Sequence, residues 1–64
     1  MTTEEFKNSL RKSNWYYKST KKSIDIISLA IVSKDKQEVK KRTTLCNRLN
    51  DLVNEYVNTP IEER

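Results

Sequence analysis

The stretch Ile24-Asp25-Ile26-Ile27-Ser28-Leu29-Ala30-Ile31-Val32 is the most apolar part of the chain, and the fold class depends on how it is interpreted. In an α-helix its apolar side chains would cover every side, so the helix would have to be buried all round. Its β-branched residues also suit a β-strand, but we find no second candidate strand, and a lone strand leaves its backbone groups without hydrogen bonds. We therefore predict a buried helix.

The segment after this stretch has the spacing of a long amphipathic helix, from about residue 36 to residue 57. Asp35 and Glu38 fit a capping box at its start, and Pro60 ends it. Asn58 suits a left-handed cap at its C-terminal end. Its apolar positions are Val39, Cys46, Leu49, Val53 and Tyr56, and they recur every three or four residues if Arg42 fills the one gap.

The first part of the chain also carries helix signals. Thr2 and Glu5 fit a capping box that opens a first helix. Ser13 and Asn14 can cap another helix, so residues 1–32 form either one helix or two, and we favour two. The absence of glycine leaves few β-turn signals. The predicted fold is all-α: a small helical hairpin or three-helix bundle over residues 1–59, followed by a short C-terminal tail over residues 60–64.

A chain of 64 residues has little surface to bury, about 60% of what its unfolded form exposes. A single cysteine, Cys46, cannot form a disulfide within the chain, and there is no histidine for a structural metal site. We therefore predict that a homodimer supplies the missing burial. The residues predicted for the core or the dimer interface are Ile24, Ile27, Ile31, Cys46, Leu49, Val53 and Tyr56.

Catalysis is hard to build from these residues. The chain has no histidine for acid–base work, no glycine-rich phosphate loop and no metal-ligand spacing. Cys46 falls on the apolar face of the second helix, with no histidine to activate it. We predict no enzymatic activity, no cofactor, no metal and no small-molecule substrate. The acidic, polar N-terminus and the lack of a long apolar run favour a cytoplasmic protein that does not span a membrane.

Positive charge is concentrated in the first half of the chain, where six Lys or Arg residues and no acidic residue lie between Phe6 and Ile24. On one continuous helix most of them would share a single face with Trp15. The residues predicted to bind a partner are Lys7, Arg11, Trp15, Tyr16, Lys18 and Lys22. A second basic patch consists of Lys36, Lys40, Lys41 and Arg42.

Two classes of macromolecular partner fit this pattern. Trp, Tyr and Arg are enriched among the residues that dominate protein interfaces, and Arg11, Trp15 and Tyr16 lie within one short segment. We therefore rank a protein partner first, with the chain acting as a small regulator of the inhibitor or adaptor type that phages and mobile elements carry. The alternative is a nucleic-acid-binding regulator, with lysines on phosphates and Trp15 stacked on an unpaired base. A membrane-surface helix is a third option, weakened by Tyr and Ser on its apolar face.

Overall fold

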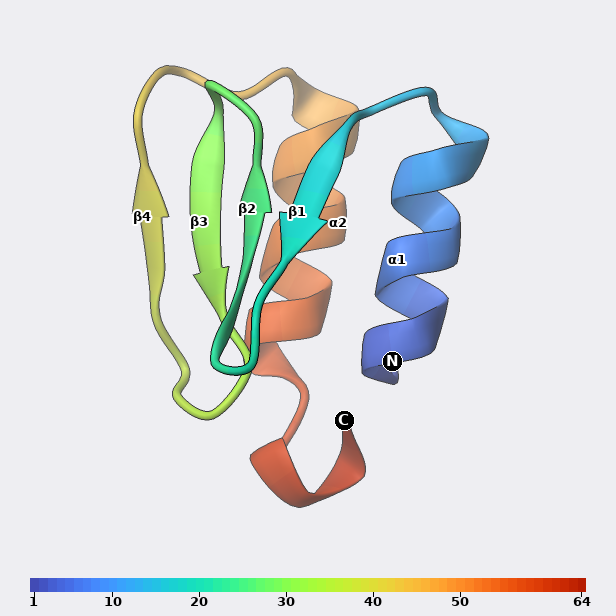
Figure 1. The fold of residues 1–64 in the computed structure, drawn as a ribbon, viewed down its shortest axis with the longest axis vertical. Helices are drawn as coiled ribbons and strands as arrows, with labels where there is room; N and C mark the ends of the chain where they lie inside the picture. Colours follow the sequence, from blue (N-terminus) through green and yellow to red (C-terminus); the bar gives the residue numbers. More distant parts are fainter.

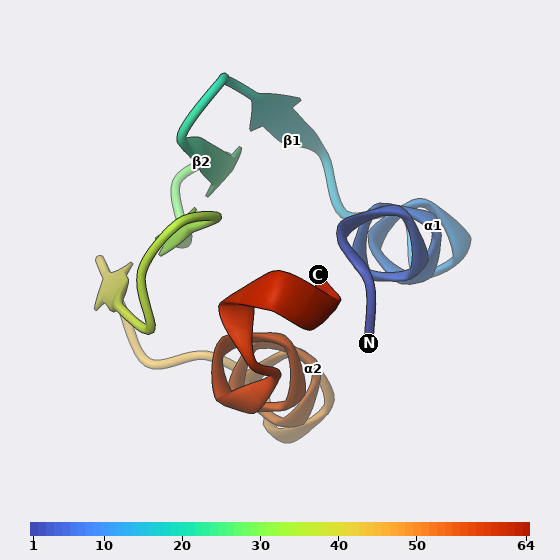
Figure 2. The same ribbon diagram turned by 90° about the horizontal axis from the view of Figure 1, so that it is seen from below.

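The computed structural model describes residues 1–64, and it has two helices packed on one face of a four-stranded antiparallel sheet (Figure 1). The strands lie across the sheet in chain order. Seen along the strands, they form an arc with both helices on its inner side (Figure 2). The elements are α1 (Thr3–Lys12), β1 (Tyr17–Ser19), β2 (Ser23–Ile26), β3 (Ala30–Ser33), β4 (Val39–Lys41), α2 (Asn47–Asn58) and the short 3-10 helix η1 (Ile61–Glu63).

The all-α prediction is therefore wrong, because the apolar stretch is a β-hairpin. Its two arms are β2 and β3, which pair with Ile24 opposite Val32 and Ile26 opposite Ala30. The turn between them passes through Ser28, which has a positive φ of 64°. The outer strands β1 and β4 have three residues each and are largely polar, so they lack the apolar signature of a strand. Those two segments are the pairing partners that the sequence reading failed to find.

The first helix begins as predicted. The Glu5 backbone N–H donates to Thr2 Oγ1 (3.1 Å), and the Thr2 N–H donates to Glu5 Oε1 (2.9 Å), which together form a capping box. The helix then ends at Lys12, where Asn14 adopts a φ of 61°. Asparagine tolerates this left-handed conformation better than most residues. Residues 1–32 therefore contain α1, β1, β2 and most of β3, instead of the predicted one or two helices.

The second helix is shorter than predicted, because it begins at Asn47 and not near residue 36. The Ser33 hydroxyl donates to Asp35 Oδ1 and accepts from the Lys36 N–H, both at 3.0 Å, so the polar residues there build a turn. The C-terminal end lies just before Pro60, as predicted. Thr59 caps it in an extended conformation, φ −71° and ψ 130°, and not Asn58 in a left-handed one.

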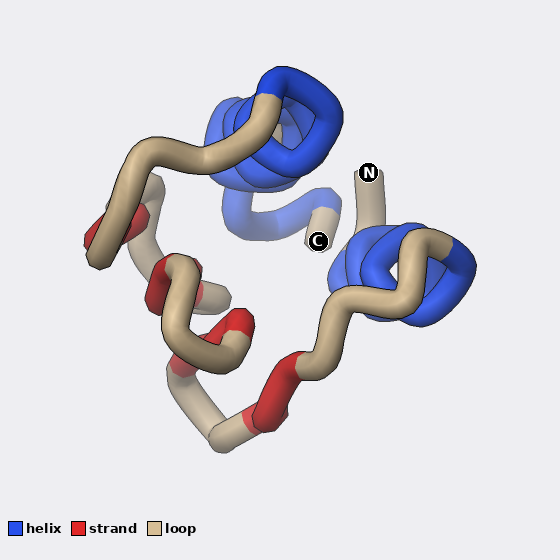
Figure 3. The backbone as a smooth tube through the Cα atoms, turned by 90° about the horizontal axis from the view of Figure 1, so that it is seen from above, coloured by secondary structure: helices blue, strands red, loops and turns tan.

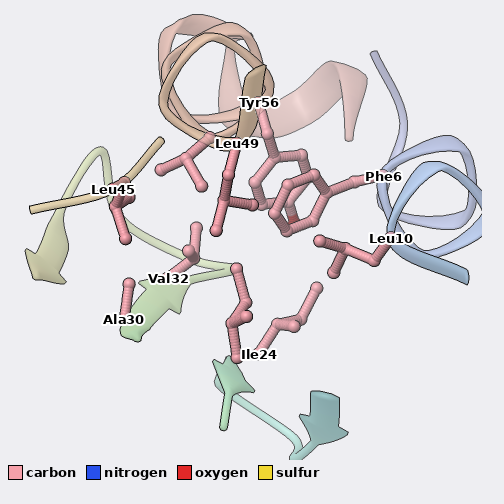
Figure 4. Packing of buried hydrophobic residues seen from close by; sticks show 10 residues of the cluster. Phe6, Leu10, Ile24, Ala30, Val32, Leu45, Leu49 and Tyr56 are labelled. Atoms are coloured by element: carbon pink, nitrogen blue, oxygen red, sulfur yellow. The ribbon is translucent and has the colours of Figure 1, made fainter. Parts of the chain in front are cut away.

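The core lies between the sheet and the two helices (Figure 4). At its centre the rings of Phe6 and Tyr56 stack with centroids 4.5 Å apart, which joins α1 to α2. The Tyr56 hydroxyl keeps a hydrogen-bond partner, Thr3 Oγ1, at 2.7 Å. The ten buried residues are Phe6, Leu10, Ile24, Ile26, Ala30, Val32, Leu45, Leu49, Val53 and Tyr56.

Of the residues predicted for the core or a dimer interface, Ile24, Leu49, Val53 and Tyr56 are buried. Cys46 is exposed, contrary to prediction, because it precedes α2 in an extended conformation and does not follow the helical spacing. Ile27 is 55% exposed and Ile31 is half-buried. In a strand alternate residues face opposite sides, so these two lie on the sheet face that the helices leave open.

The last residues pack against the domain instead of trailing away from it. The Arg64 guanidinium donates to three carbonyls of the β3–β4 loop region and to two at the end of α2. It also lies over the Tyr56 ring, 4.7 Å from the centroid. The Thr3 N–H donates to the Arg64 carbonyl at 3.0 Å, which ties the start of α1 to the same place. Arg64 therefore links both helices to the sheet.

Candidate functional site

Three loops meet at one end of the molecule, the upper end in Figure 1 and the near end in Figure 3. They connect α1 to β1, β2 to β3 and β4 to α2. Residues 11–16, 27–29 and 41–48 make up this end, and none of them is acidic. We call it the basic loop end, after its five cationic side chains, which are Arg11, Lys12, Lys41, Arg42 and Arg48.

The opposite end is electrically balanced. It consists of residues 1–7, 20–22, 34–38 and 58–64, which hold equal numbers of acidic and basic side chains. The acidic ones are Glu4, Glu5, Asp35, Glu38, Glu62 and Glu63, and the basic ones are Lys7, Lys21, Lys22, Lys34, Lys36 and Arg64. Three carboxylates and two lysines lie between the two ends. The net charge of +4 therefore comes from the basic loop end.

Two of the five cations of the basic loop end are held in place without being neutralised. Arg11 donates to Asn8 Oδ1 (3.0 Å), and Lys41 donates to Asn50 Oδ1 (2.6 Å), so neutral amide oxygens orient both side chains. Only Arg42 has an ion pair, with Asp25 at 3.7 Å. Both side chains of that pair are partly exposed, so the pair is weak. This end thus keeps its charge for an external anion.

The N-terminus of α2 adds to the same positive field. Cys46 occupies the N-cap without a side-chain hydrogen bond, and the first turn carries no acidic residue. The partial positive charge of the helix end is therefore not offset there. A hollow of about 600 Å³ lies beside it, lined by Lys41, Arg42, Thr43, Thr44, Leu45, Asn47 and Asn50.

The sheet face away from the helices adjoins the basic loop end. Strand register aligns four residues across this open face, which are Lys18, Asp25, Ile31 and Lys40. Nearer the basic loop end, the Ile27 N–H donates to the Tyr16 carbonyl at 3.2 Å. Tyr16 is 81% exposed and Ile27 is 55% exposed. An aromatic and an aliphatic side chain are thus open to solvent where the face meets the loops.

A groove runs between the two helices from the basic loop end to Glu55 in the second half of α2, so it extends beyond the region that has no carboxylate. Its volume is about 310 Å³, and its apolar lining comes from Trp15 and Leu52. Trp15 also packs partly against the core. The polar lining mixes both charges and consists of Ser9, Lys12, Ser13, Arg48, Asp51 and Glu55.

The residues predicted to bind a partner do not share one face, because α1 ends at Lys12. Arg11, Trp15 and Tyr16 lie at the basic loop end, Lys18 lies on the open face, and Lys7 and Lys22 lie at the opposite end. The second basic patch also divides. Lys41 and Arg42 belong to the basic loop end, Lys40 to the open face, and Lys36 to the opposite end.

Sequence reasoning missed two members of the basic loop end, Lys12 and Arg48. Both belong to segments that carry cations and no acidic residue, 11–16 and 41–48. That compositional signal was visible in the sequence. What brings the two segments together is the antiparallel path of α1 and α2, which places the end of one helix beside the start of the other.

Two side chains at the balanced end have shifted pKa values. Burial lowers the pKa of Lys34, and the nearby positive charge of Lys7 lowers it further. The Lys34 ammonium donates to Ser19 Oγ (2.7 Å) and the Thr20 carbonyl (2.6 Å). The pKa of Glu5 is also lowered, mainly by the hydrogen bond from the Thr2 backbone. The pKa shift of Lys34 thus comes from burial and a like charge, and that of Glu5 from the capping box that opens α1.

Comparisons with protein-family models, curated proteins and solved structures found no match to this chain. None of its helices combines the length and the apolar character needed to cross a membrane. No group of three or more His, Cys, Asp or Glu side chains is placed to hold a metal ion. Function must therefore be argued from the charge and shape of the surface.

Proposed function

We propose that this protein is a non-enzymatic regulator that binds nucleic acid through its basic loop end. One observation supports the proposal. Five cations lie at the basic loop end, whose residues include no carboxylate, and this end accounts for the net positive charge of the protein. Nucleic acid carries its charge in closely spaced phosphates, which suits a cluster of five cations of which only Arg42 has an ion pair within the protein.

The dimensions of the molecule agree with several simultaneous phosphate contacts. Its extents are 27 × 22 × 21 Å, so the basic loop end is about 20 Å wide. Duplex DNA carries one negative charge per about 1.7 Å of its axis, which gives such an end about ten phosphates to face. Five contacts would give a slope of log affinity against log salt of about −4.5 on duplex.

The proposal reverses the ranking drawn from the sequence. A protein partner came first because Arg11, Trp15 and Tyr16 lie within one short segment, and most of the nearby cations were expected to share one helical face with Trp15. That face requires a helix that continues past Lys12, and α1 ends there. The basic loop end is now the strongest feature of the surface, and it favours an anionic polymer.

Charge reversal at the two ends tests the proposal. Lys41→Glu with Arg48→Glu changes the basic loop end, and Lys21→Glu with Lys36→Glu changes the opposite end by the same charge at exposed positions. We expect the first pair to abolish binding of a labelled oligonucleotide in fluorescence anisotropy and the second to preserve most of it. Circular dichroism checks that both variants fold. Equal losses in the two variants, or no binding by the wild type at low salt, would contradict the proposal.

A protein partner remains the second candidate, and the groove between α1 and α2 favours it. Trp15 and Leu52 offer an apolar centre inside a rim of mixed charge, a pattern typical of protein interfaces. An inhibitor or adaptor would bind there. Capture from a native lysate with and without nuclease separates the candidates. A protein that stays bound after nuclease, and is lost with Trp15→Ala in a folded variant, would support this second function.

We extend the proposal to location and assembly. The exposed thiol of Cys46 suits a reducing compartment such as the cytoplasm. The homodimer stays a proposal, and its interface would have to use Ile27 and Ile31 on the open face, since the other apolar residues of that stretch are buried or packed against the core. Sedimentation at several concentrations tests it, and a monomer at high concentration would exclude it.

A further inference from the structure

Tyr16 and Ile27 are the two most exposed large apolar side chains in the protein, at 81% and 55%. They are neighbours, because the Ile27 N–H donates to the Tyr16 carbonyl. An exposed aromatic ring and an aliphatic side chain have no favourable contact to make with phosphates. They do have one to make with nucleic-acid bases, because every base has a flat face that stacks on an aromatic ring. In a duplex those faces are covered by neighbouring bases, and in an unpaired strand they are accessible.

From these positions we infer that the protein prefers an unpaired strand of DNA, with one base stacked on Tyr16 and the adjoining phosphates on the basic loop end. The inference rests on the proposed function. Charge complementarity supports this occupant. Lys18 in β1 and Arg42 just after β4 both lie beside Asp25 on the open face. Arg11 and Lys12 precede Tyr16 at the basic loop end, so the phosphates next to a base stacked on Tyr16 would have cations nearby.

In this arrangement Ile27, the neighbour of Tyr16, favours DNA over RNA. A ribose beside the stacked base would bring its 2′-hydroxyl next to an aliphatic side chain that offers no hydrogen bond. Losing water from a hydroxyl without gaining a partner is unfavourable. Deoxyribose has no such group to satisfy.

Fluorescence anisotropy at fixed salt tests the inference, with three labelled probes of equal length: oligo-dT, its duplex with oligo-dA, and oligo-U. We expect oligo-dT to bind more tightly than the other two. Tyr16→Ala should weaken oligo-dT binding by about 5- to 150-fold, the range expected for loss of one stacked base. Duplex binding should change by less than about twofold, because a duplex offers no accessible base face for Tyr16 to stack on. Tyr16→Phe retains the ring and should bind like the wild type.

The exposure of Tyr16 makes these substitutions safe for the fold, and circular dichroism checks it. The salt slope on oligo-dT should be the same for the wild type and Tyr16→Ala, since both keep all cations. Equal affinity for oligo-dT and duplex, or equal losses on both with Tyr16→Ala, would overturn the inference and leave the proposed function standing. Tighter binding of oligo-U would overturn the choice of DNA. Failure to bind any probe would remove both.

Discussion

Removing the Arg64 side chain should destabilise the whole domain. Its guanidinium donates to the carbonyls of Thr59 (3.1 Å), Ser33 (3.0 Å), Lys34 (3.3 Å), Lys36 (3.0 Å) and Val57 (2.8 Å). In Arg64→Ala these carbonyls lose their donor, and the Tyr56 ring loses the cation above it. The β3–β4 loop and the end of α2 would then be joined by fewer contacts.

The magnitude follows from these contacts. A net hydrogen bond contributes about 0.5–1.5 kcal/mol, and the low end applies here because water can replace the donor at partly buried carbonyls. The cation over Tyr56 adds about 0.5–1 kcal/mol. Allowing for non-additivity, we expect a loss of about 2–4 kcal/mol. A domain of this size has a total stability of only about 3–10 kcal/mol, so the melting temperature should fall by at least about 10 °C.

Urea and thermal unfolding, followed by far-UV circular dichroism and Trp15 fluorescence, measure this loss. Arg64→Lys keeps the charge but lacks the planar fork of donors, so it should recover only part of the stability. Arg48→Ala removes an exposed arginine from the basic loop end and should change stability by less than about 0.5 kcal/mol. A melting temperature for Arg64→Ala within about 3 °C of the wild type would refute the reasoning.

Three further predictions concern single positions. Ile26→Asp puts a charge into the core and should unfold the protein, whereas Ile27→Asp changes a residue that is 55% exposed and should leave the protein folded. Circular dichroism compares the two variants, and similar behaviour would contradict the strand register. The Cys46 thiol should react quickly with a bulky thiol reagent in the native state, and a protected thiol would argue against the exposed N-cap. Cys46→Ser should stabilise the protein by about 0.5–1 kcal/mol in urea unfolding, because serine supplies the missing side-chain cap of α2. The hydrogen bonds from Thr2 lower the pKa of Glu5 below its ordinary 4.5, so their stabilisation is complete above that pH and is lost as the pH falls through the lower pKa of the folded state. Glu5→Gln should therefore flatten the acid side of the stability–pH curve, and an unchanged curve would be evidence against the capping box.

The two helices were predictable to the extent that their signals are local. A capping box joins Thr2 to Glu5, three residues away, and the helix opens there whatever lies elsewhere in the chain. Pro60 likewise stops α2 through its own missing N–H. The regular apolar spacing of Leu49, Val53 and Tyr56 lies within α2, and these residues are buried as such spacing indicates. Upstream of Asn47 the same spacing continued by coincidence and extended the predicted helix too far.

The sheet was not predictable in this way, because its outer strands exist through pairing alone. Tyr17–Ser19 and Val39–Lys41 have only three residues each and little apolar character. A strand this short gains its backbone hydrogen bonds only by pairing with a neighbour, β1 with β2 and β4 with β3, and no signal within the three residues predicts that pairing. Without those neighbours, the apolar stretch between them offered a choice between a buried helix and a lone strand, and the helix was preferred. The choice of hairpin also reversed the environment of Ile27, because alternate residues of a strand face opposite sides.

By itself, the sequence determined the net positive charge, the segments without carboxylates, the first helix and the end of the last one, because each depends on residue identity or on contacts within one turn of helix. The tertiary structure alone decided which cations share a surface. Lys7 and Arg11 are one helical turn apart, yet Lys7 lies at the balanced end and Arg11 at the basic loop end. Lys12 and Arg48 are far apart in the chain and line the same groove. The reason is that each element runs from one end of the domain to the other, so the direction of the chain assigns every loop, and its charge, to an end.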